Sequence, residues 1–108
     1  MTTWFISRHP GAIEWAERKG LPIDHYVVHA DPLQIQPGDT VIGGLPVGLV
    51  AAVCARGARY LHLTLDLPAH LRGRELSADQ LEQLDARLEE YQVKNTPNAA
   101  PLNRKMGP

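Results

Sequence analysis

The residues best suited to chemistry in this chain stand together in one short stretch, Ser7-Arg8-His9-Pro10-Gly11. The stretch places a hydroxyl, a guanidinium and an imidazole between an apolar run and a proline that suits the first turn of a helix. A helix start carries free amide groups and the positive end of the helix dipole, so it attracts anions. The pattern therefore predicts an anion site, although an ordinary loop in which Ser7 or His9 caps the helix would have the same sequence.

Two further segments have residue types that bind phosphate. Gly43-Gly44-Leu45-Pro46 follows an apolar run, and its glycines allow the backbone to approach a ligand closely or simply to make a tight turn. Arg72-Gly73-Arg74 is a cationic loop that could hold a phosphate, although the adjacent Glu75 reduces the local charge. A solvated turn is the alternative interpretation of this second segment.

Several kinds of site are excluded or disfavoured by spacing. No Lys-Ser/Thr pair follows Gly48, so there is no P-loop, and the glycine spacing does not match a dinucleotide-binding fingerprint. His25 and His29 fall on one face of an expected strand, where four residues span roughly 13 Å, too far to share a metal ion. Cys54 lies in an apolar run and is expected to be a buried structural thiol. We therefore expect neither a metal nor a cofactor.

Length and composition limit the class of protein to which these residues can belong. The chain has 108 residues, of which 44% are hydrophobic, and this favours one globular domain with a real core. A single cysteine excludes a disulfide framework and suits a reducing compartment. The sequence has no signal-peptide pattern or membrane-length apolar run, so we expect a cytoplasmic protein that does not bind a membrane. The net charge of −1 gives no general attraction for long nucleic acids, so any polyanion must meet a local cluster of cations.

The elements expected to position the candidate residues alternate along the chain. Apolar and β-branched runs predict strands over 3–7, 25–29, 40–42 and 60–65. Proline and glycine punctuation predicts helices over 10–19 and 46–56. Such an order indicates a small, Rossmann-like open α/β sheet of about four mostly parallel strands, with helices on both faces. We expect the spatial order 2-1-3-4 and leave the direction of the third strand open.

A last helix is predicted from a capping box at its start. Ser77 and Gln80 have the spacing of that motif, and Leu81, Leu84, Leu88 and Tyr91 then repeat at three- and four-residue steps. We therefore expect a helix through Tyr91, a domain over residues 1–94, and a mobile, proline-containing tail over 95–108.

Ligands of open α/β sheets bind outside the carboxyl ends of the strands, near the point where the strand order reverses. The first expected strand ends at Ser7-Arg8-His9 and the third at Gly43-Gly44. The loop that carries Arg72 and Arg74 follows the fourth strand. The three cationic or glycine-rich segments are therefore expected to meet at one edge of the sheet.

Three longer strings resemble a known family. TTWFISRHPGAIEWA, PGDTVIGGLPVGLVAAVCARGARYLHLTLDLP and LRGRELSADQL are similar to a small CRISPR-associated accessory family found beside type III CRISPR systems. That family resembles a stand-alone ring nuclease, and the resemblance covers residues 1 to about 93. It implies a Rossmann-like dimer that binds cyclic oligoadenylate, with cyclic tetra-adenylate as the expected ring, and cuts it to switch off antiviral signalling.

The resemblance carries over only onto SRHPG, GGLP and RGRE. It implies that Arg8 stabilises the reacting phosphate and that His9 acts as general acid or base. The substrate-binding residues implied are Ser7, Gly11, Gly43, Gly44, Leu45, Pro46, Arg72 and Arg74. RNA carries its own nucleophile in the ribose 2′-OH, so no metal is required for this reaction.

Three hypotheses follow. The first is a metal-independent phosphodiesterase acting on cyclic oligoadenylate. The second is a sensor or sponge of the same fold that sequesters the ring without cutting it, and the third is an interaction protein without a ligand. The first two predict a homodimer, because one small protomer offers only half a cradle for a symmetric ring. The apolar helix over 46–56 and the stripe of Leu81, Leu84 and Leu88 are the candidate interfaces. The helix is favoured, because the stripe is also needed to cover the sheet.

Overall fold

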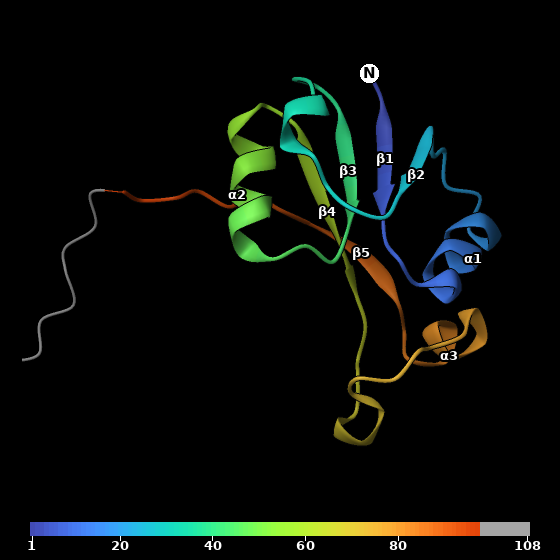
Figure 1. The fold of residues 1–108 in the computed structure, drawn as a ribbon. Helices are drawn as coiled ribbons and strands as arrows, with labels where there is room; N and C mark the ends of the chain where they lie inside the picture. Colours follow the sequence, from blue (N-terminus) through green and yellow to red (C-terminus); the bar gives the residue numbers. More distant parts are fainter. Residues whose placement is uncertain (98–108) are drawn as a thin grey trace, which may run out of the picture.

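A five-stranded sheet forms the centre of the molecule. The computed structural model describes residues 1–97. The sheet consists of β1 (Thr3–Ile6), β2 (His25–Val27), β3 (Thr40–Gly43), β4 (Arg59–Thr64) and β5 (Arg87–Tyr91). The strand order is β2-β1-β3-β4-β5 (Figure 1). The first four strands are parallel and β5 pairs antiparallel with β4. The expected order 2-1-3-4 is thus confirmed, and the third strand runs parallel to the first.

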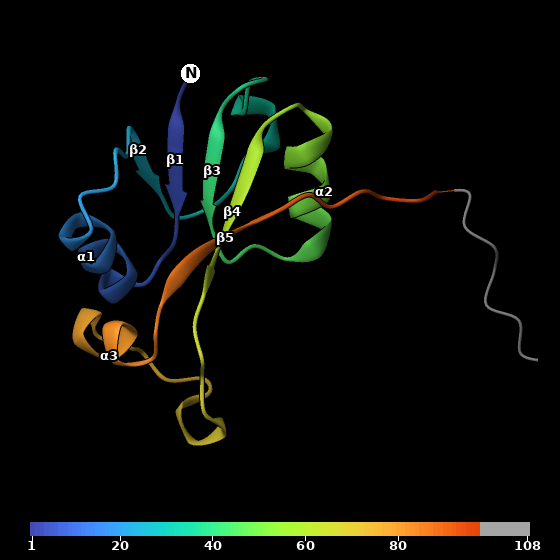
Figure 2. The same cartoon turned by 180° about the vertical axis from the view of Figure 1, so that it is seen from behind.

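The two faces of the sheet are covered by different helices. Helices α1 (Pro10–Arg18) and α3 (Ala78–Gln83) lie on one face, while α2 (Val47–Ala55) and the 3-10 turn η1 (Pro32–Gln34) lie on the other (Figures 1 and 2). Side chains alternate along the strands, so that Phe5 faces the core of α1 and α3 while Ile6 faces the core of α2. The expected open α/β sheet with helices on both faces is confirmed.

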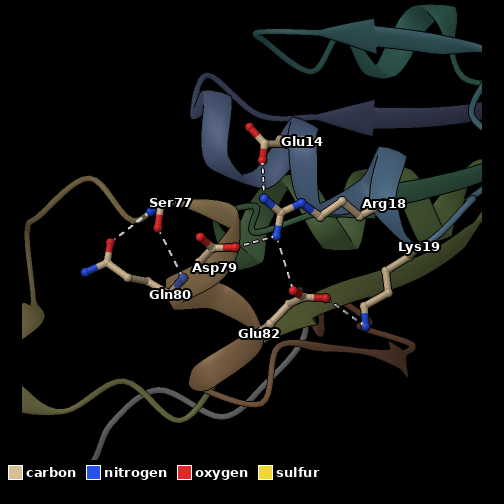
Figure 3. Close-up of polar contacts among 7 residues, drawn as sticks. All are labelled: Glu14, Arg18, Lys19, Ser77, Asp79, Gln80 and Glu82. Atoms are coloured by element: carbon tan, nitrogen blue, oxygen red, sulfur yellow. Dashed lines mark hydrogen bonds and ion pairs between the residues drawn. The ribbon is translucent and has the colours of Figure 1, made fainter.

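Helices α1 and α3 are joined by a cluster of charged side chains around Arg18 (Figure 3). Its guanidinium donates to Asp79 at 2.6 Å and Glu82 at 3.2 Å on α3, and to Glu14 on its own helix at 2.6 Å. The expected capping box also forms, since the Ser77 hydroxyl accepts from the Gln80 amide and the Gln80 side chain accepts from the Ser77 amide. Exposed ion pairs contribute little individually, but this network fixes how α3 sits on α1.

The expected helix from Ser77 through Tyr91 is wrong in its second half. Helix α3 ends at Gln83, the chain reverses through Asp85 with φ of 57°, and residues 87–91 form β5. Leu88 therefore lies opposite Leu63 of β4 rather than on a helical stripe. The added strand covers the edge of β4, which four strands would leave unpaired.

The sequence predicted a domain that ends at residue 94 and a tail over 95–108. Residues 98–108, most of that tail, lie outside the described residues. Within residues 1–97, none of the helices combines the length and the apolar character needed to cross a bilayer.

Candidate functional site

A pocket of about 600 Å³ opens at the carboxyl ends of β1 and β3. These two strands are neighbours, yet the helices that follow them, α1 and α2, lie on opposite faces of the sheet. Figure 1 shows β1 and β3 ending side by side, with α1 and α2 diverging from them. Such a divergence is the switch point at which open α/β sheets bind their ligands.

The structure brings most of the predicted site residues to this pocket. Its lining includes Ser7, Arg8 and His9 from the β1–α1 loop, the Gly43–Pro46 turn, and Arg74 from the loop that precedes α3. Three stretches that are distant in the sequence thus meet at the edge of the sheet that the sequence indicated.

Two predicted residues lie outside the lining. Arg72 is exposed and follows the 3-10 turn η2 (Ala69–Leu71), two residues from Arg74. Gly11 sits in the first turn of α1, where an added Cβ would collide with the backbone oxygen of Leu76. The geometry therefore explains Gly11 by close packing between α1 and the segment before α3.

His9 has a partner that the sequence did not reveal. Its Nδ1 lies 2.7 Å from Oε1 of Glu75. A carboxylate only accepts hydrogen bonds, so this contact places a proton on Nδ1 and, in the neutral ring, leaves Nε2 as the acceptor. A histidine held in this way can take a proton from a substrate hydroxyl. Glu75, which the sequence suggested only weakens the local charge, therefore orients the candidate base.

The starts of both helices at the pocket lack a side-chain cap. His9 is the N-cap of α1 and Pro46 that of α2, and neither makes a capping hydrogen bond through its side chain. The Ser7 hydroxyl accepts instead from the His9 amide at 3.1 Å, which holds the β1–α1 loop together. The positive ends of two nine-residue helices thus border a pocket whose lining includes Arg8 and Arg74, an arrangement suited to an anion.

A buried tyrosine, Tyr60, holds the Gly43–Leu45 turn through hydrogen bonds. The Tyr60 hydroxyl donates to the Gly43 carbonyl at 2.9 Å and accepts from the Leu45 amide at 3.0 Å. Nδ1 of His62 lies 2.7 Å from the same oxygen, so a proton on that nitrogen satisfies all three contacts together. Burial raises the pKa of Tyr60, whose side chain is 2% exposed, and this keeps the hydroxyl protonated. Tyr60 therefore fixes the turn without entering the pocket.

The two glycines of this turn differ in purpose. A Cβ on Gly43 would lie 2.6 Å from the Ile6 carbonyl oxygen, so only glycine fits the close approach of β3 to β1. A Cβ on Gly44 would meet no atom within 4 Å. Gly43 thus has a structural role, while Gly44, which also lines the pocket, has open space around it.

Sequence reasoning missed most of the apolar side of the pocket. These side chains come from the ends of β1 and β4, from α1, α2 and α3, and from the segments after β2 and before α3: Phe5, Ile6, Ala12, Val28, Ala30, Leu49, Leu63, Leu65, Leu76 and Leu81. His29, which the sequence placed at the end of the second strand, also lines the pocket. Among the described residues, His, Cys, Asp and Glu side chains form no group of three or more that could hold a metal ion.

The fold and the pocket define a small α/β domain with a pocket at the switch point of its sheet. The chain belongs to the family described as Putative CRISPR-associated protein (Cas_VVA1548), whose model matches residues 4–94. Comparisons with curated proteins and with solved structures found no match.

Proposed function

We propose that this CRISPR-associated protein is a ring nuclease that binds and cleaves cyclic oligoadenylate, with cyclic tetra-adenylate as the expected substrate. Membership of a CRISPR-associated family supports a role in antiviral defence, and the resemblance to type III accessory proteins supports this second messenger. One observation carries the proposal: Arg8, His9 and Arg74 meet the Gly43–Pro46 turn around a single pocket.

The proposed reaction needs no nucleophile from the protein. The ribose 2′-OH attacks the adjacent phosphorus, its proton passes to Nε2 of His9, and the bond from phosphorus to the 5′-oxygen breaks. The departing 5′-oxygen takes up a proton from water, so the products are linear fragments with a 2′,3′-cyclic phosphate and a 5′-hydroxyl. Arg8 and Arg74 stabilise the charge that develops on the phosphate oxygens.

The protein is also proposed to act as a homodimer. A cyclic tetranucleotide has twofold symmetry, so two copies of the pocket related by a twofold axis can meet equivalent phosphates. No long nucleic acid is required, because the cations at the pocket are local and the net charge of the chain is −1.

The test is incubation of the purified protein with cyclic tetra-adenylate in excess EDTA, followed by mass spectrometry of the products. The expected result is fragments ending in a 2′,3′-cyclic phosphate, and a ring with 2′-deoxy linkages should remain intact. Arg8→Ala should slow single-turnover cleavage by about 10²-fold, the loss typical of one removed charge-stabilising donor.

Loss of activity in EDTA, or cleavage of the 2′-deoxy ring, would show that the attacking group is not the 2′-OH. Tight binding without any product would instead identify a sensor or sponge. The absence of both binding and cleavage would overturn the proposal.

A further inference from the structure

Two apolar side chains at the pocket pack against neither core of the protein. Val28, just after β2, is 56% exposed, and Leu49, in the first turns of α2, is half-buried. Both line the pocket, yet neither is among the described side chains that join or pack against the two hydrophobic clusters. Leu63, Leu65 and Leu76, by contrast, line the pocket and also pack against the core of α1 and α3. Ala30 and Leu45 line the pocket and pack against the core of α2.

Val28 and Leu49 reach this one pocket from different elements. The segment that follows β2 passes the end of β1 and leads to η1, on the face of the sheet that α2 covers (Figures 1 and 2). It brings Val28 and Ala30 to the pocket that Leu45 and Leu49 line from the α2 side. We call Val28, Ala30, Leu45 and Leu49 the apolar wall.

The same pocket has two cationic side chains, Arg8 and Arg74, which we call the cationic rim. His9 and His29 also line this pocket, whose volume is about 600 Å³. A bound phosphate alone would leave the wall exposed to water, so the pocket fits a ligand that has an anionic part and an apolar part close together. The partial exposure of Val28 favours a flat group that is covered on one face over a flexible acyl chain, which needs an enclosed channel.

We propose that the apolar wall is a nucleobase subsite. It would pack against one face of an adenine while the cationic rim holds the phosphate attached to the same nucleoside. This inference rests on the proposed function for the identity of the nucleotide, but the subsite itself requires only binding, not cleavage.

The test compares matched variants of the full-length chain. Leu49→Ala removes part of the wall, and Leu33→Ala makes the same change on η1, where Leu33 is 77% exposed and lies outside the pocket lining. Val28→Ser is a second, independent change in the wall. Dissociation constants are measured by NMR titration with adenosine 5′-monophosphate, ribose 5-phosphate and dodecyl phosphate, and thermal melts check that each variant is folded.

The expected result is that Leu49→Ala and Val28→Ser each weaken adenosine 5′-monophosphate binding by about 5–10-fold, the effect of losing one to two buried methylene contacts. Ribose 5-phosphate binding should be unchanged, and Leu33→Ala should match the unsubstituted protein. Equal losses for both phosphates, no loss for either, or tighter wall-dependent binding of dodecyl phosphate would overturn the subsite.

The cleavage assay separates this proposal from the proposed function. If the wall variants weaken adenosine 5′-monophosphate binding while cyclic tetra-adenylate is not cut, the subsite stands and the ring nuclease fails. If cyclic tetra-adenylate is cut and the wall variants bind all ligands normally, the subsite fails alone.

Discussion

At the scale of single residues, the chemistry of His9 depends on which ring nitrogen carries the proton. The 2.7 Å contact with Glu75 puts the proton on Nδ1 and fixes the ring from outside the pocket lining. Glu75 also brings a negative charge close to a site proposed to bind a phosphodiester, so it opposes binding while it supports proton transfer. This combination gives Glu75 a kinetic signature that a merely structural residue would lack.

We therefore expect Glu75→Ala to slow single-turnover cleavage of cyclic tetra-adenylate by about 10-fold, within the range of general-base effects, while leaving ring affinity unchanged or tighter. Glu75→Gln should fall between, because its carbonyl can still accept from Nδ1. Glu17→Gln on α1 removes a negative charge outside the pocket lining, so as the control it should leave cleavage and ring affinity unchanged. In a His9→Ala background the Glu75 effect should vanish, and a full effect there would show that Glu75 acts on something other than His9.

The two arginines of the 72–74 segment provide a matched pair, since only Arg74 lines the pocket. Arg74→Ala should weaken ring binding by about 10-fold or more, the loss of one charge-assisted hydrogen bond. Arg72→Ala should stay within about 2-fold, because Arg72 does not line the pocket and salt screens an exposed charge at a distance from the ligand. Equal effects of the two substitutions, measured by fluorescence titration, would contradict this assignment.

At the scale of elements, the sequence predicted the helix starts and turns, because residues close together in the sequence determine them. The capping box, the helix that begins after His9 and the glycines at 20 and 57 with positive φ all followed from spacing and backbone preference. The end of α3 did not, because Leu81, Leu84 and Leu88 fit a helical stripe as well as a helix followed by a strand. Pairing with β4 decides between a continuous helix and a helix followed by a strand. That pairing is long-range: beside it, Arg59 bonds Glu90 across 31 residues of sequence.

In the candidate site, too, the sequence predicted some residues and missed others. Its positive residues could be predicted because they follow strand ends, and parallel strands bring their carboxyl ends to one edge. The contacts of Tyr60 and Glu75 could not, since each joins side chains whose separation along the sequence carries no periodic signal.

Substitution of Gly11 tests whether α1 and the segment before α3 are closely packed. Gly11→Ala should lower the free energy of unfolding by about 1–3 kcal/mol, because the new methyl group meets the Leu76 backbone rather than a flexible side chain. Gly48→Ala in α2 has open space around it and should be neutral or stabilising by up to about 1 kcal/mol. Urea denaturation of both variants at one protein concentration measures the difference, and a neutral Gly11→Ala would contradict the packing role.

Asp39 ties the N-terminus to the start of β3. Its carboxylate, 3% exposed, accepts from the Gln36 amide at 3.0 Å, the Thr2 amide at 2.9 Å and the Trp4 indole at 3.1 Å. The hydrogen bond from the Gln36 amide, followed by those from Thr2 and Trp4, holds the pKa of Asp39 below its ordinary value of 3.8, against the opposing effect of burial. The folded state therefore favours the ionised carboxylate more than the unfolded state does.

Stability from Asp39 should be fully present at neutral pH and should fall as the pH drops below about 4 toward the lowered folded pKa, where it is lost. Asp39→Asn should cost about 1–3 kcal/mol at pH 7, because at least one buried donor loses its acceptor. Its free energy of unfolding should also depend less on pH in this acid range. An unchanged pH slope in urea titrations from pH 7 to pH 3 would contradict the argument.

At the scale of the whole molecule, α2 is buried on one side and partly exposed on the other. Val50 and Val53 are buried in the core, whereas Val47 is 70% exposed and Ala55 is exposed. A hollow beside Ala51, Ala52 and Ala55 is also lined by residues 92–95. An almost entirely apolar helix of this kind is stable in a small protein when a partner covers its open side.

We expect this open side of α2 to form the interface of the proposed homodimer. The unsubstituted protein should therefore have the mass of a dimer at micromolar concentration in sedimentation equilibrium. Ala55→Glu should shift it to a monomer with little change in its circular dichroism, because the charge lies at an exposed position of the fold that belongs to the expected contact. The same charge change at an exposed position on the opposite face of the sheet, Gln83→Glu on α3, should leave the dimer intact. If the ring spans two protomers, Ala55→Glu should also weaken binding of cyclic tetra-adenylate more than binding of adenosine 5′-monophosphate, which needs one pocket only. A monomeric mass for the unsubstituted protein, with and without the ring, would contradict the dimer.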